Sequence, residues 1–116
     1  LTAEFLRYAR DWPMPKKVLN ISSGLGRRAM AAQSAYCAAK AAVLRLTESL
    51  AAELKHAGIN ANAVLPSTID TPQNRAANPS ADHARWVSPD AIADVVVFLA
   101  SDAARAIHGA AVPVYT

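Results

Sequence analysis

Cysteine, glycine and long uncharged runs are all scarce in this sequence, and each shortage excludes a class of protein. The single cysteine, Cys37, excludes an intrachain disulfide and favours a reducing compartment, so we expect a cytoplasmic protein. The longest stretch without Asp, Glu, Lys or Arg runs from His56 to Ile69 and has only 14 residues. It is too short and too polar to cross a bilayer, so no membrane partner is expected.

The charges show no strong excess of either sign. The chain has 12 basic and 9 acidic residues, a net charge of +3, and they are scattered without runs of like sign. This pattern argues against nucleic acid as a partner. The basic pairs Lys16-Lys17 and Arg27-Arg28 are expected to be solvated surface, and no function is assigned to them. The histidines, at positions 56, 83 and 108, have no partner at metal-ligand spacing, so no metal site is predicted.

Hydrophobic spacing predicts alternating helices and strands. The first helix ends near Asp11, because Trp12-Pro13 disfavours its continuation. Ser88-Pro89 is typical of a helix start. The predicted elements are a helix to about residue 11, a strand at 18–21, a helix at 34–57 with Gly58 as its C-cap, a strand at 59–65, a long loop at 67–87, a helix at 88–101 and a strand at 109–115. This order predicts a single α/β domain with a parallel sheet between helices.

Three polar residues are placed for chemistry at the carboxyl edge of this predicted sheet. Tyr36 and Lys40 are four residues apart, so they share one face of the long helix. An ammonium group beside a phenol favours the phenolate, which suits proton transfer near neutral pH. Ser23 ends the preceding strand, where open α/β sheets bind ligands, and its hydroxyl can hold a substrate oxygen. A Tyr and a Lys at this spacing occur in many helices, so the pair gains its meaning from this setting.

Three sequence blocks carry a resemblance to a known enzyme family. They are Asn20-Ile21-Ser22-Ser23, the segment 34–43 with sequence SAYCAAKAAV, and Asn62-Ala63-Val64-Leu65-Pro66. In this order they resemble the short-chain dehydrogenase/reductase family, over nearly the whole chain. The resemblance implies part of a Rossmann-like doubly wound parallel sheet, in which this chain supplies the three C-terminal strands with their flanking helices.

The resemblance also implies a catalytic role for each of the three polar residues. Ser23 would orient and polarise a carbonyl group, and Tyr36 would be the general acid in reduction. Lys40 would favour the phenolate of Tyr36 and bind the nicotinamide ribose. The implied reaction is hydride transfer between NADP or NAD and a small-molecule carbonyl or alcohol, coupled to protonation of the oxygen.

The segment after the second strand would line the nicotinamide of this cofactor. Its expected contacts are Pro66, Ser67, Ile69 and Thr71, chiefly through the Ile69 backbone and the Thr71 hydroxyl. The family usually has glycine where this chain has Ser67, whose side chain would narrow the backbone's approach to the cofactor. A glycine-rich turn for the pyrophosphate is absent from a sequence with four glycines. We therefore expect a fragment or part of a complemented assembly, with one strand edge unpaired and doubtful activity on its own.

The sequence leaves the substrate and the assembly open. The stretch 65–72 and Trp86 resemble dihydropteridine reductases, which suggests a pterin, whereas Ser23 favours a general ketone or 3-oxoacyl reductase. Trp86 and Arg75 are candidates either for substrate contact or for anchoring the loop. Small residues along the helix at 34–57 predict close packing, and the resemblance implies a homodimer or homotetramer. The rival hypothesis is a non-catalytic fragment or assembly module that uses this helix and lacks the nucleotide site.

Overall fold

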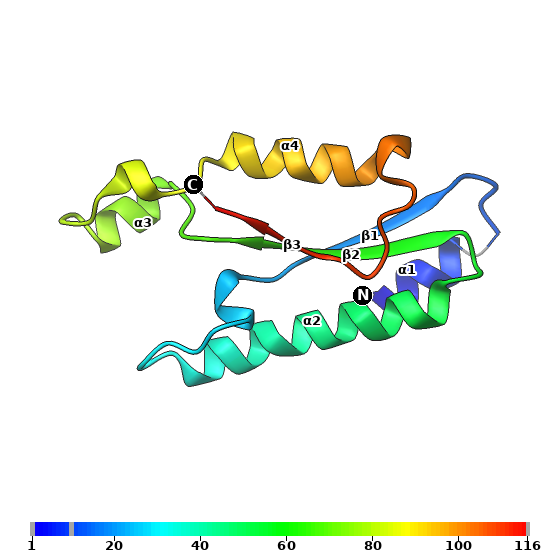
Figure 1. The fold of residues 1–116 in the computed structure, drawn as a ribbon, viewed down its shortest axis with the longest axis horizontal. Coiled ribbons are helices and arrows are strands. Elements are labelled where there is room, and N and C mark those ends of the chain that lie inside the picture. Colours follow the sequence, from blue (N-terminus) through cyan, green and yellow to red (C-terminus); the bar gives the residue numbers. More distant parts are fainter. Residues whose placement is uncertain (1, 10, 116) are drawn as a thin grey trace.

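The chain folds as alternating helices and strands (Figure 1). The computed structural model describes residues 2–9 and 11–115. In chain order the elements are α1 (Thr2–Ala9), β1 (Lys16–Ile21), the 3-10 helix η1 (Gly24–Gly26), α2 (Ser34–Leu54), β2 (Ile59–Pro66), α3 (Pro72–Ala77), the 3-10 helix η2 (His83–Arg85), α4 (Pro89–Ala100), the 3-10 helix η3 (Asp102–Ala104) and β3 (Ala111–Val114). The predicted α/β class is confirmed.

The described strands form one parallel sheet in the order β1-β2-β3. Ile21 at the end of β1 pairs with Val64, and Pro66 at the end of β2 pairs with Val114. Helix α2 covers one face of this sheet and α4 covers the other (Figure 1). Among the described strands β1 pairs with β2 alone, so its outer edge is unpaired, as predicted.

Side chains that alternate along β2 build a core on both faces of the sheet. Ala61 and Leu65 face α2, where Leu65 packs with Leu44. Val64 faces the other way and packs with Leu99 of α4. All five of these side chains are buried. A strand covered on both faces must be apolar along its length, which is the pattern that the sequence shows.

The polar exceptions in β2 are Asn60, which is partly exposed, and Asn62, which is fully buried. The Asn62 Nδ2 donates to the Ile107 carbonyl and its Oδ1 accepts from the Ala110 N–H, both at 2.9 Å. Nearby, His108 Nδ1 accepts from the Ala61 N–H at 3.2 Å, and its Nε2 donates to a carbonyl of α2 at 2.7 Å. These bonds satisfy buried backbone groups and fix the turn before β3 against β2 and α2.

Four predicted elements have wrong boundaries. β1 begins at Lys16, two residues before its predicted start at residue 18. Helix α2 ends at Leu54, before the predicted end at residue 57, and its C-cap is Lys55. Gly58 lies beyond the cap, where a φ of +67° turns the chain into β2. β3 is confined to residues 111–114, because only these pair with β2. The predicted end of the first helix is also late, since Asp11 already lies in a turn.

The segment 67–87 was expected to be a loop but contains α3 and η2. Thr71 caps α3, because its hydroxyl accepts from the Asn74 N–H, and Pro72 occupies the first turn. This is the same hydroxyl-then-proline signature that predicts the start of α4 at Ser88. A helix of six residues is too short to show a helical period, so only its cap could have revealed it.

Candidate active site

A cavity of about 590 Å³ opens at the carboxyl ends of β1 and β2. Of the predicted site residues, it is lined by Ser23, Tyr36, Lys40, Pro66, Ser67 and Ile69. Thr71 is the one that does not line it. Parallel strands end at the same edge of a sheet, which is why segments 43 residues apart in sequence meet here.

Ser23 lies directly after β1 in extended backbone and caps η1. Its Oγ accepts from the Leu25 N–H at 3.2 Å, which leaves the hydroxyl hydrogen free to donate into the cavity. The neighbouring Ser22 is buried and donates to the Lys40 carbonyl at 2.8 Å. This bond ties the end of β1 to α2, and so fixes the serine loop relative to the helix that carries Tyr36 and Lys40.

Tyr36 and Lys40 lie on the first turns of α2, as the four-residue spacing predicts. The Lys40 Nζ is 5.7 Å from the centre of the Tyr36 ring. The same Nζ donates to the Ile21 carbonyl at 3.2 Å, at the end of β1. The ammonium group is therefore held beside the phenol, which is itself 45% exposed at the cavity. A cation over an aromatic ring is attracted by the negative face of that ring.

Gly26 lies outside the cavity lining but packs against the elements that carry the lining residues. A Cβ atom on it would lie 2.8 Å from the Lys40 carbonyl oxygen and 2.9 Å from the Ser22 Oγ. The contact shows that η1 packs directly on the backbone of α2. Ser22 and Gly26 together set the distance between the serine loop and helix α2. Their local sequence gives no sign of these contacts, because the partner, Lys40, lies much further along the chain.

The segment that follows β2 presents several unsatisfied polar groups. The Ser67 N–H donates to the Val114 carbonyl at 3.1 Å, but its Oγ is buried without a hydrogen-bond partner among the described residues. The Ile69 carbonyl is taken by Asn74 Nδ2 at 2.8 Å, whereas no bond to the Ile69 N–H is found within residues 2–9 and 11–115. The Thr71 hydroxyl accepts from the Asn74 N–H and keeps its own hydrogen.

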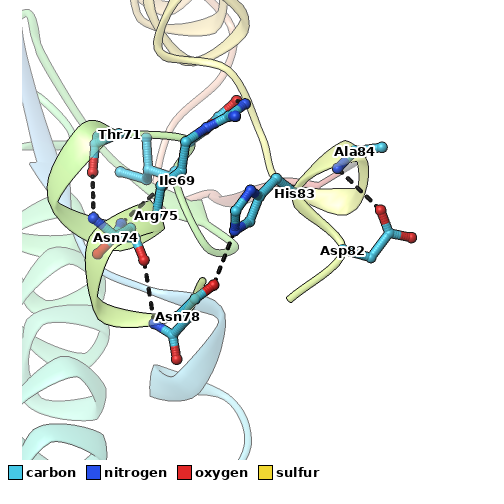
Figure 2. A network of polar contacts seen from close by, with 9 residues as sticks. Ile69, Thr71, Asn74, Arg75, Asn78, Asp82, His83 and Ala84 are labelled. Atoms are coloured by element: carbon cyan, nitrogen blue, oxygen red, sulfur yellow. Dashed lines mark hydrogen bonds and ion pairs between the residues drawn. The ribbon is translucent and has the colours of Figure 1, made fainter. Parts of the chain in front are cut away.

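Figure 2 shows how side chains within the segment 67–87 hold this conformation. Arg75 and Asp70 form a two-pronged ion pair, with Nη2 and Oδ2 at 2.7 Å. That hydrogen bond from Arg75 holds the pKa of the Asp70 carboxyl below its usual value. His83 Nε2 lies 2.9 Å from the Asn78 carbonyl oxygen. Hydrogen bonds and an ion pair between its own residues hold the segment together. It extends beyond the end of the sheet (Figure 1).

Its two ends are also joined. Ile69 and Val87 form a parallel bridge, in which the Asp70 N–H donates to the Val87 carbonyl at 2.8 Å. The Trp86 ring lies 4.4 Å from the His83 ring, and neither ring lines the cavity. Of the two roles considered for Trp86, contact with substrate or anchoring of the loop, this packing supports the second.

In the described part of the chain, no three His, Cys, Asp or Glu side chains are grouped as metal ligands would be. Nor does any helix within residues 2–9 and 11–115 combine the length and the apolar character that crossing a membrane requires.

Known proteins match this chain over most of its length. The family model described as enoyl-(acyl carrier protein) reductase matches residues 2–115. Galactitol 2-dehydrogenase of Rhizobium johnstonii is 44% identical over 92 residues, which cover 71% of this chain and 36% of that enzyme. Curated relatives of this kind are more than twice as long as the part that this chain spans.

Two solved structures have the same fold. An oxidoreductase of the short-chain dehydrogenase/reductase family from Burkholderia thailandensis has a TM-score of 0.79 at 33% identity, and the match covers 97% of this chain and 47% of that one. A candidate 2-deoxy-D-gluconate 3-dehydrogenase from Agrobacterium tumefaciens, solved with bound NADP, has a TM-score of 0.88 at 34% identity. That match covers 97% of this chain and 50% of the other.

Proposed function

The chain belongs to the short-chain dehydrogenase/reductase family, and from this premise we propose that it supplies the catalytic half of an NAD(P)-dependent oxidoreductase. The reaction is hydride transfer between nicotinamide and a carbonyl or alcohol. One observation carries the proposal. Ser23, Tyr36 and Lys40, which lie on two different elements, line a single cavity together with the polar segment after β2.

In the direction of reduction, each residue has one task. The Ser23 hydroxyl donates to the substrate carbonyl oxygen and orients it. Tyr36 transfers its phenolic proton to that oxygen as the carbonyl is reduced, and the Lys40 ammonium stabilises the phenolate that is left. When bound, NAD(P)H supplies the hydride. In oxidation the phenolate accepts the proton back from the alcohol.

The groups after β2 fit the nicotinamide end of this cofactor. A buried hydroxyl without a partner is costly, so the Ser67 Oγ favours a ligand that completes its bonding. The Ile69 N–H, which has no bond among the described residues, is a further donor for a carboxamide at the cavity. The remaining hydrogen of Thr71 is a second donor, from just outside the cavity lining. Pro66 ends β2 at the cavity wall. Ser67 thus adds a donor where the family usually has glycine.

Binding of the cofactor's pyrophosphate requires a glycine-rich turn that this chain does not contain. The chain spans less than half the length of its curated relatives, so we propose that residues 1–116 form the C-terminal catalytic half of a single Rossmann-like domain. A nucleotide-binding half, encoded with it or supplied by another chain, would pair with the open edge of β1. We propose the cytoplasm as its location.

The substrate is a small-molecule carbonyl or alcohol. Galactitol 2-dehydrogenase, by its name, oxidises a secondary alcohol of a polyol, and the resemblance of the 65–72 stretch to dihydropteridine reductases keeps a pterin as a candidate. A ketone or 3-oxoacyl compound is the other candidate.

Helix α2 offers the surface for a homodimer or homotetramer. Its outward residues Ala38, Ala39 and Ala42 are exposed, and Leu46 is 49% exposed. A strip of small side chains lets a second helix approach closely. The same strip suits the rival function, a non-catalytic assembly module.

The test is carried out on the full-length protein, after its intact mass has been measured. Fluorescence titration with NADPH and NADH should give dissociation constants in the micromolar range, and carbonyl compounds should accelerate nucleotide oxidation. Light scattering on the same sample gives the oligomer. A well-defined oligomer that binds neither nucleotide would reject the oxidoreductase and favour the assembly module.

A further inference from the structure

The cavity carries more positive charge than the proposed reaction uses. Two cations line it, Lys40 and Arg28, and no Asp or Glu does so among the described residues. Lys40 is engaged with the Ile21 carbonyl and the Tyr36 ring. The Asp70 carboxylate of the neighbouring segment is paired with Arg75. Arg28 is therefore the cation of this cavity that has no assigned task.

The two members of the Arg27-Arg28 pair differ in their surroundings. The Arg27 side chain donates to the Ala111 carbonyl at 2.7 Å, and its N–H donates to the Gly24 carbonyl at 3.1 Å. These bonds anchor the loop after η1 to β3. The Arg28 guanidinium forms no hydrogen bond or ion pair with the other described residues. The sequence predicts that both arginines are solvated surface. In the structure, Arg27 anchors the loop to β3, whereas Arg28 presents at the cavity a guanidinium without a partner among the described residues.

Arg28 also comes from a segment that the cofactor does not require. The proposed nicotinamide contacts lie on α2 and after β2, whereas Arg28, Met30 and Gln33 enter the lining from the loop between η1 and α2. A volume of about 590 Å³ is within the range that holds a small organic ligand. A guanidinium presents a planar fork of donors that matches an oxoanion in two-pronged fashion.

We propose that Arg28 binds an oxoanion on the substrate, so that this site prefers carbonyl compounds that carry a carboxylate or phosphate group. This inference rests on the proposed function, since it names the substrate class of the same site. No acidic residue among the described lining competes for Arg28, so an anionic substrate gains a charge-assisted bond from it that a neutral substrate cannot make.

The test compares a charged ketone with its neutral analogue in the full-length protein. Initial rates of NAD(P)H oxidation are measured with 4-oxocyclohexanecarboxylate and with its methyl ester, for wild type, Arg28→Gln, Arg28→Lys and Arg105→Gln. Arg105 is the matched control, because it is exposed near the start of β2, away from the cavity. In parallel, calorimetry on the protein with and without bound nucleotide measures binding of cyclohexanecarboxylate and cyclohexanecarboxamide, which are not turned over.

The wild type should prefer the acid to the ester. Arg28→Gln should raise KM for the acid about 10- to 100-fold, the range for a charge-assisted bond, with KM for the ester and both kcat values unchanged. Arg28→Lys should recover part of the loss, and Arg105→Gln should match wild type. The carboxylate should bind more tightly than the carboxamide in wild type but not in Arg28→Gln.

Two outcomes would overturn the inference. In the first, the wild type turns over the ester as well as the acid, or binds the carboxamide as tightly as the carboxylate. In the second, Arg28→Gln raises KM equally for the acid and the ester. Failure of nucleotide binding and of all turnover would instead reject the proposed function. The calorimetric comparison separates the two cases, because it reads anion preference without turnover.

Discussion

Replacing Gly26 by alanine is the most informative single change at the site, because it acts on spacing without removing any functional group. The added Cβ would lie 2.8 Å from the Lys40 carbonyl oxygen, whereas ordinary contact begins at 3.4 Å. That oxygen belongs to the backbone of a 21-residue helix and cannot swing away. The helix and η1 must separate by roughly half an ångström, which strains the Ser22–Lys40 hydrogen bond.

Two effects should follow in the full-length protein. Overpacking of this kind costs about 1–3 kcal/mol, so Tm should fall by about 2–10 °C in calorimetry. Small misplacements of catalytic groups cost about 10- to 100-fold in rate, so kcat should fall by this factor in the steady-state assay. Nucleotide affinity should change less, because the segment after β2 is untouched.

Gly58→Ala is the matched control. It also adds a methyl group to a glycine, but nothing lies within 4 Å of the new atom. Its φ of +67° imposes a backbone cost of about 1 kcal/mol, so Tm should fall slightly while kcat stays at the wild-type value. An active, fully stable Gly26→Ala variant, or equal losses of kcat in both variants, would refute the positioning argument.

Two further changes test other parts of the account. Asn62→Leu leaves the Ala110 N–H without its partner, while the Ile107 carbonyl keeps its bond from Asn60 Nδ2, so the change should cost about 1–3 kcal/mol in urea denaturation; a loss below about 1 kcal/mol would contradict the role of Asn62. The lowered pKa of Asp70 means that its pairing with Arg75 stabilises the 67–87 segment above the usual value of 3.8 and is lost as pH falls through the lowered pKa. Hydrogen exchange of this segment should therefore be faster at neutral pH in Asp70→Asn than in wild type, and the difference should vanish in strong acid; equal exchange at neutral pH would contradict it.

The sheet and its two long helices could be predicted because their patterns are periodic. The apolar residues on both faces of β2 indicate burial on both sides, and the structure places α2 and α4 there. The Ser88-Pro89 cap marks the start of α4 correctly. Tyr36 and Lys40 share a helix face at four residues' separation, which any α-helix guarantees.

What the sequence could not predict depends on contacts between distant segments. The Ser22 hydroxyl bonds a carbonyl 18 residues away, and Arg27 bonds one 84 residues away. The residues next to Ser22 and Arg27 in the sequence give no sign of these distant partners. For this reason the sequence predicts only that the Arg27-Arg28 pair is solvated surface. Helix α3 could not be predicted for a different reason. Its six residues are too few to show a helical period of apolar residues, and only the cap at Thr71 marks its start.

The central claim, that the phenol of Tyr36 delivers the proton in hydride transfer, is tested most directly by Tyr36→Phe in the full-length protein. The single-turnover rate of carbonyl reduction should fall by about 100- to 10,000-fold, while the NADPH dissociation constant and the oligomer mass stay unchanged. A reduction rate close to that of wild type, with nucleotide bound, would contradict this claim.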